Sequence, residues 1–179
     1  MLVITGTLFF FHHRGHGGHG VLLIKQKKLY VLCALCGEFP YLCSVMEKFE
    51  LHILGCGSAL PTTRHFATSQ VVNVRDKLYM IDCGEGSQLQ FRKSRLKFSR
   101  LNHIFISHLH GDHCFGLLGL ISTLNLLGRT AELHIHSPKG LEALFVPMLS
   151  FFCRQMTYQV LFHEFETKEP GMIYEDRSL

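Results

Sequence analysis

Apolar and polar residues follow two different periods along most of this chain. Short runs that alternate with period two, or that are continuously apolar, predict strands: residues 49–54, 69–74, 77–82, 103–107, 132–136 and 158–165. Stretches with helical spacing predict helices: residues 87–93, 115–127 and 141–152. This order of elements predicts an α/β (α+β layered) domain whose functional groups lie at the ends of strands.

Residues 1–45 do not follow this pattern. Their apolar run, residues 2–11, is too short to span a bilayer as a helix, and no Lys or Arg precedes it as in a secretory signal. A regular pattern begins at Met46. We therefore predict that residues 1–45 are an upstream extension outside the native domain, that residues 46–179 form the domain, and that the chain has no membrane partner.

Composition narrows the class of protein. The 179 residues are 47% hydrophobic and 18% charged, as expected of one globular domain with a core. The net charge is +4, but residues 46–179 hold fourteen Lys and Arg against thirteen Asp and Glu, so any nucleic-acid contact must come from a local patch. The seven cysteines have no regular spacing, which predicts a reducing, cytoplasmic compartment.

Two segments have the composition of such a patch. The stretch 92–100 carries five Lys and Arg, and it is either a solvated helix end or an edge that binds phosphates. In the loop before residue 69, Arg64 could contact a phosphate backbone and Phe66 could stack on a base. Both residues are equally compatible with an ordinary loop.

The densest chemistry lies in the segment that follows the strand predicted at 103–107. His108, His110, Asp112 and His113 place four potential metal ligands within six residues, between a buried strand and a helix. Neutral imidazole and carboxylate together suit zinc. His108 and His110 can share one ion while Asp112 and His113 face a second, which is the arrangement of a two-metal hydrolase.

A second acidic residue belongs beside these ligands. Asp82 ends a predicted strand, where it either hydrogen-bonds a ligand histidine or caps the following loop. Gly84 and Gly86 predict a tight turn into the next helix, with Ser87 as a possible N-cap. His134 and His136 share one face of a predicted strand, and we favour a structural role for them.

Four motifs in this order resemble the ribonuclease Z (tRNase Z) family of metallo-β-lactamase-fold hydrolases: Leu54–Thr62, Ile81–Gln88, Ser107–His113 and Ser137–Leu141. The resemblance implies an αβ/βα sandwich and a cytoplasmic, homodimeric zinc endoribonuclease. This enzyme removes the 3′ trailer from precursor tRNA and leaves a tRNA 3′-hydroxyl and a trailer 5′-phosphate. It also implies two Zn²⁺ ions per subunit of the complete enzyme.

The same resemblance assigns roles to the metal motif. His108 and His110 bind the first zinc ion, Asp112 and His113 bind the second, and Asp112 accepts a proton. The family's later metal ligands and its tRNA-gripping arm have no counterpart among the motifs found, so the chain is predicted to be the N-terminal half of the fold. The alternatives are another hydrolase of this fold, acting on small phosphodiesters or esters, and an inactive fragment of the tRNase.

Overall fold

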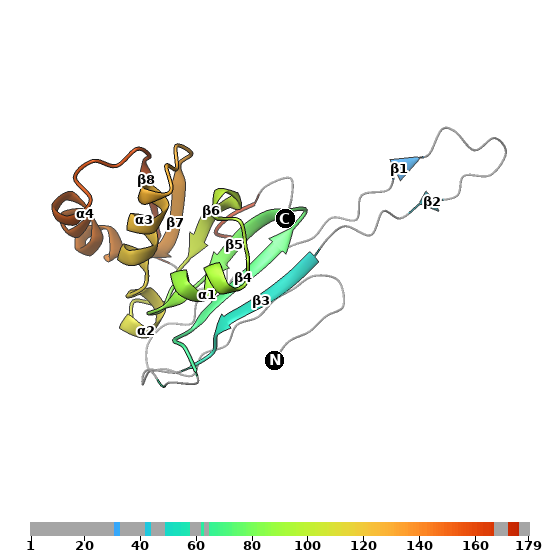
Figure 1. Ribbon diagram of the computed structural model, residues 1–179, viewed down its shortest axis with the longest axis horizontal. Helices are drawn as coiled ribbons and strands as arrows, with labels where there is room; N and C mark the ends of the chain where they lie inside the picture. Colours follow the sequence, from blue (N-terminus) through green and yellow to red (C-terminus); the bar gives the residue numbers. More distant parts are fainter. Residues whose placement is uncertain are drawn as a thin grey trace.

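The computed structural model describes residues 31–32, 42–43, 49–57, 62, 65–166 and 172–175. Most of the predicted extension, and also Arg64, lie outside the described residues. Within the extension, the strands β1 (Val31–Leu32) and β2 (Leu42–Cys43) pair antiparallel with each other (Figure 1). The boundary at Met46 stays a prediction.

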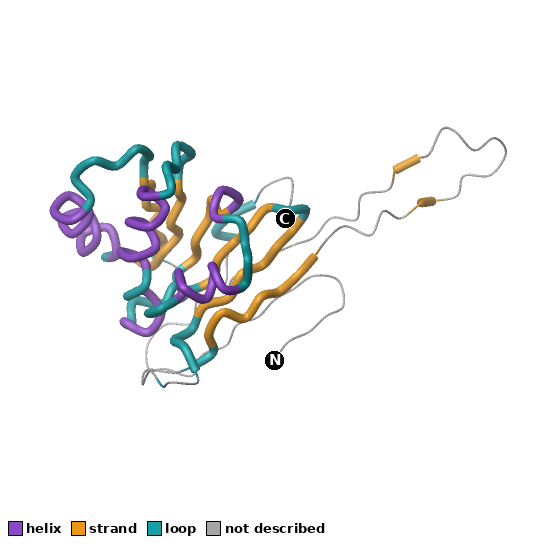
Figure 2. Tube along the Cα trace, in the orientation of Figure 1, coloured by secondary structure: helices purple, strands orange, loops and turns teal. Residues whose placement is uncertain are grey.

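A six-stranded mixed sheet forms the body of the described structure (Figures 1 and 2). Its strands are β3 (Phe49–Gly55), β4 (Ser69–Val74), β5 (Lys77–Ile81), β6 (Leu101–Phe105), β7 (Leu133–Pro138) and β8 (Val160–Phe165). Their order across the sheet is also their order in the sequence. The strands from β3 to β5 pair antiparallel, and those from β5 to β8 pair parallel. A two-residue turn joins β4 to β5, whereas helical crossovers join the later strands and so allow parallel pairing.

The helices cover one face of this sheet (Figure 1). They are α1 (Ser87–Lys93), α2 (Gly111–Cys114), α3 (Leu117–Leu126) and α4 (Leu141–Phe152), with a 3₁₀ turn at Phe98–Arg100. Their apolar side chains, such as Phe91, Leu120 and Phe145, form one buried cluster with the inward residues Ile104 and Ile135 of the strands. Among the described residues, no helix combines the length and the apolar character needed to cross a membrane.

The hairpin and the helix at 87–93 are confirmed, and so is α4, which continues through Pro147. The helix predicted at 115–127 is shorter, and a separate short helix, α2, precedes it. Ser87 is not the N-cap: Gly86 takes that position with a φ of 80°, and the Ser87 hydroxyl donates to the Gly84 carbonyl at 2.6 Å. The left-handed conformation required there favours glycine over serine.

Four histidine rings gather on the other face of the sheet: His103, His134, His136 and His163. His134 and His136 lie two residues apart on β7, while the register places His103 beside His134 and His163 beside His136. Burial, and after it the neighbouring histidines, together lower the pKa of His136 to about 3. His136 is therefore neutral in the folded protein.

This neutral histidine makes the stability sensitive to acid. Its pKa is about 3 in the folded chain and 6.5 in the unfolded one, so between these values only the unfolded chain binds the proton. We expect His136 to lower the free energy of unfolding by up to about 1.4 kcal/mol for each pH unit below 6.5. Urea unfolding at about pH 7 and about pH 5, with EDTA present, measures this loss.

The matched variant for this measurement is His136→Phe, because the ring of His136 already stacks on Phe105 at 4.5 Å between centroids. We expect the variant to lose less stability than the parent chain between the two pH values. An equal loss in both proteins would assign the acid sensitivity to other groups.

Candidate metal centre

The segment with four potential ligands connects β6 to α3 at the carboxyl end of the parallel strands. The Ile106 amide donates to the His136 carbonyl at 2.8 Å, which fixes the start of the segment to β7. The His113 amide donates to the His110 carbonyl at 3.0 Å and closes the first turn of α2. Gly111 lies inside this turn, where a Cβ would overlap the ring of Phe115.

The ligand side chains converge in two pairs. His108 Nε2 lies 3.1 Å from His110 Nδ1, and His113 Nε2 lies 3.5 Å from the Asp112 carboxylate. Two ligand atoms on one tetrahedral zinc ion are about 3.3 Å apart, given Zn–N distances of about 2.0–2.1 Å. Ligand atoms of His108, Asp112 and His113 also lie within 4.8 Å of one another, and His110 lies outside this group of three. The donor set therefore fits zinc.

Asp82 lies against the most deeply buried of these ligands. It follows β5 with a φ of 57°, and one carboxylate oxygen accepts a hydrogen bond from His113 Nδ1 at 2.7 Å. The other oxygen accepts the Ser107 amide at 2.8 Å. Because a carboxylate only accepts, His113 carries its proton on Nδ1 and presents a lone pair on Nε2 toward Asp112.

Ser107 is a site residue that the sequence analysis missed. Its hydroxyl lies 3.0 Å from the Asp82 carboxylate, 3.2 Å from His108 Nδ1 and 3.1 Å from His113 Nδ1. It thus connects Asp82 to both imidazoles. Its position directly after an apolar strand and directly before His108 was the available signal.

Close backbone contacts hold the ligand segment against the loop that follows Asp82. The Cys83 amide donates to the His113 carbonyl at 2.7 Å, and the Gly116 amide donates to the Cys83 carbonyl at 2.8 Å. A Cβ on Gly116 would lie 2.1 Å from the Gly84 carbonyl oxygen, and one on Gly84 would lie 2.4 Å from the Asp112 carbonyl oxygen. The two loops meet at a distance that only glycine permits.

The two buried cysteines beside the ligands are not part of the donor set. Burial raises the pKa of the Cys83 thiol and that of the Cys114 thiol. The Asp82 carboxylate raises both pKa values further, and the Asp112 carboxylate raises that of Cys114. A thiol with a raised pKa stays protonated, whereas a metal ligand must be a thiolate. His and Asp side chains therefore supply the candidate ligands.

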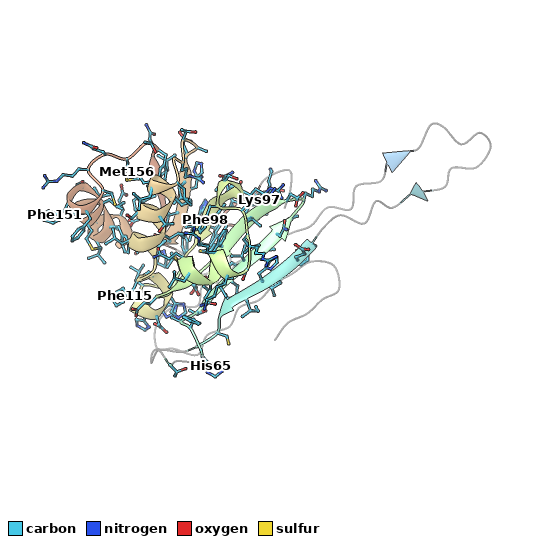
Figure 3. The ribbon with its side chains drawn as sticks, in the orientation of Figure 1. His65, Lys97, Phe98, Phe115, Phe151 and Met156 are labelled. Atoms are coloured by element: carbon cyan, nitrogen blue, oxygen red, sulfur yellow. The ribbon has the colours of Figure 1, made fainter. Side chains whose placement is uncertain are left out.

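Phe66 lies beside the same loop, half-buried. Its ring contacts Gly86, since a Cβ there would be 3.0 Å from it, and the Lys93 ammonium lies 5.6 Å from the ring centroid. His65, which Figure 3 labels, is exposed next to it. Phe115, also labelled, is 72% exposed on the far side of the ligand segment, and the sequence analysis did not single it out.

Comparisons with known proteins show what the chain is similar to. Residues 49–150 match the family model described as Anti-Pycsar protein Apyc1. Over 134 residues, 75% of this chain, the sequence is 83% identical to a ribonuclease Z of Bacteroides thetaiotaomicron and 81% identical to one of Bacteroides fragilis. The matched part spans 42% and 44% of those two relatives, so the chain covers less than half of their length.

A solved structure supports the fold. The crystal structure of the short form of human tRNase Z superposes with a TM-score of 0.60 at 36% identity. The match covers 64% of this chain and 44% of the human one. The described sheet and helices thus share the fold of a tRNase Z, as the motifs predicted.

Proposed function

We propose that the chain, which belongs to the family described as Anti-Pycsar protein Apyc1, is part of a zinc-dependent endoribonuclease, and its similarity to ribonuclease Z relatives and to human tRNase Z supports this proposal. Its substrate is precursor tRNA, from which it removes the 3′ trailer. The products are a tRNA with a 3′-hydroxyl and a trailer with a 5′-phosphate. The observation that carries this proposal is the convergence of His108, Asp112 and His113 at the end of a parallel strand.

The metal set follows from the two pairs of ligands. His108 and His110 hold the first zinc ion, and Asp112 and His113 hold the second. Distances of 3.1 and 3.5 Å within these pairs support the assignment. When bound, the two ions would supply Lewis acidity that neutralises charge developing on a phosphate and makes an attacking water more acidic.

The side chains of this chain orient the site and move a proton. Asp112 is half-buried at the end of the donor group, where its carboxylate accepts the proton released in the reaction. Asp82 keeps the proton of His113 on Nδ1, so that Nε2 always faces the site. Ser107 restricts the rotation of both imidazoles by contacting each of them.

Arg64 and Phe66 contact the RNA next to the reacting phosphate. The support for Phe66 is the position of its ring between Gly86 and Lys93, because Gly86 belongs to the loop whose Gly84 lies against the Asp112 carbonyl. Arg64 is assigned from the sequence alone, since it lies outside the described residues.

The protein works as a homodimer in the cytoplasm. Exposed apolar side chains at the ends of α3 and α4 support a subunit interface: Leu126, Phe151 and Phe152 are 83, 64 and 66% exposed. Figure 3 labels Phe151. Contiguous exposed apolar surface is typical of association sites. Free Cys83 and Cys114 support a reducing compartment. Sedimentation equilibrium of the purified chain tests the dimer, and a monomer at all concentrations would contradict it.

The activity is tested by incubating the zinc-loaded chain with a precursor tRNA and mapping the new ends. We expect a released trailer, and we expect EDTA to prevent its release. Turnover of a small phosphodiester without trailer release would instead favour a different hydrolase of this fold. Binding of fewer than one zinc ion per chain, together with no cleavage of either substrate, would identify an inactive fragment.

Replacing Asp82 by asparagine tests how His113 is oriented. The amide can donate to Nδ1, which favours the tautomer with its proton on Nε2 and so removes the lone pair that faces the metal position. We expect the affinity for zinc to fall about 10–100-fold. Competition with a chromogenic chelator measures it. Asp76→Asn, at the β4–β5 turn, is the matched control and leaves the affinity unchanged.

A further inference from the structure

A group of cations lies in the last turn of α1 and in the segment that follows it toward β6, outside the metal centre. Four of them are exposed, and we call them the α1 basic edge: Arg92, Lys93, Arg95 and Lys97. None of the four has a carboxylate partner within ion-pairing distance among the described residues. Arg100, by contrast, pairs with Asp76 at 2.8 Å. The edge therefore carries positive charge that the described part of the fold does not neutralise.

Apolar residues between these cations anchor the segment to the core. Leu96 and Phe98 pack against the buried cluster, and the Phe98 ring lies 4.6 Å from the ring of Phe91 between centroids. Lys97 and Phe98 are adjacent in sequence but differ in environment, one exposed and one half-buried (Figure 3). These apolar contacts hold the backbone of the segment against the core, while the side chains of the cations face solvent.

The edge is connected to the metal centre by a short chain of contacts. The loop at Gly84 touches the Asp112 carbonyl, Gly86 of the same loop touches the Phe66 ring, and Lys93 lies over that ring. A cation over an aromatic face is held by the quadrupole of the ring. The Phe66 ring therefore connects the Lys93 ammonium to the loop that lies against the metal centre.

We propose that the α1 basic edge binds the phosphates of single-stranded RNA next to the cleaved bond, with Phe66 positioning Lys93 as its first contact. This rests on the proposed function only in taking RNA as the ligand. The four cations of the edge lie within six consecutive residues, 92–97. A row of cations beside an aromatic ring is the usual composition of a groove that follows a single strand.

Salt dependence of binding tests this proposal. A fluorescent oligouridine of about ten nucleotides is titrated with the chain in EDTA, so that no cleavage occurs, from about 50 to about 300 mM NaCl. We expect Lys93→Gln with Arg95→Gln to weaken binding at least about tenfold at low salt. The slope of log affinity against log salt should fall by about 1.4, which is about 0.7 for each lost phosphate contact.

A control with the same loss of charge separates a site from a general charge effect. Lys139→Gln with Arg154→Gln removes two exposed cations near α4, one of them also beside a phenyl ring, that of Phe151. We expect this control to keep the parental slope. Phe66→Leu keeps an apolar side chain but no aromatic face, and we expect it to weaken binding about threefold.

Two results would overturn the proposal: an unchanged slope in the Lys93→Gln, Arg95→Gln variant, or an equal loss in the control. Thermal melts of each variant check that the fold is intact. The proposal and the proposed function fail separately. Trailer release with an unchanged slope contradicts only the basic edge, whereas a reduced slope without trailer release contradicts only the enzymatic function.

Discussion

Replacing Asp112 by alanine is expected to lower the rate of trailer release by about 10³-fold while leaving tRNA affinity within about twofold of the parent. The Asp112 side chain is the proposed proton acceptor, and it is also one of three side chains whose ligand atoms converge, together with those of His108 and His113. Its loss removes the base and one zinc ligand together. The phosphates are held elsewhere in our proposal, by Lys93 and its neighbours, so binding should persist.

Single-turnover cleavage and filter binding measure these two quantities on the same preparations. Glu142→Ala, an exposed carboxylate in the first turn of α4, controls for the change in charge and should match the parent in both. A parallel fall in cleavage and binding would show that Asp112 mainly maintains the fold of the ligand segment. A variant that still releases the trailer at the parental rate would remove Asp112 from the mechanism.

The second large effect is expected from Gly116→Ala. The new Cβ would lie 2.1 Å from the Gly84 carbonyl oxygen and 2.8 Å from the Cys83 carbonyl oxygen, and both of these are backbone atoms that cannot rotate away. The two loops that carry Asp82 and the ligands must then separate. We expect the free energy of unfolding to fall by about 2–4 kcal/mol, and zinc affinity to fall with it.

Urea unfolding and chelator competition measure these losses. Gly119→Ala is the matched control on α3, because its Cβ would meet only the flexible end of Gln88, with the nearest atom at 2.8 Å. Alanine also favours the helix by up to about 1 kcal/mol, so this variant should be as stable as the parent or more stable. Equal stability of the Gly116→Ala and Gly119→Ala variants would disprove the close contact between the loops.

Much of the fold could be predicted because each element has a local signal. The alternation in residues 69–74 and 77–82 required a hairpin, and the short turn between them left no room for another connection. α2 had no such signal, since four residues are too few to show a helical period. The hydrogen bonds from the His113 amide to the His110 carbonyl and from the Phe115 amide to the Gly111 carbonyl make this segment helical, and they are visible only in three dimensions.

The candidate site was also only partly predictable from the sequence. The four ligands are close in sequence, so their spacing pointed to one place. Asp82 is 31 residues from His113, and its strand position made it a candidate without naming which histidine it contacts. Of the four histidines on the far face, the sequence placed only His134 and His136 together. His103 and His163 join them through the register between neighbouring strands. Register between parallel strands depends on the crossovers between them, and no single strand encodes it.

The agreement between sheet order and sequence order has a consequence for how the chain folds during synthesis. Every strand from β4 to β8 pairs with the strand made just before it. The sheet can therefore grow by addition at one edge as residues leave the ribosome, without waiting for a distant partner. Such local pairing lowers the entropy cost of closing loops and speeds folding. Nascent chains that stop after β6 should already protect the amides of the β4–β5 hairpin from hydrogen exchange.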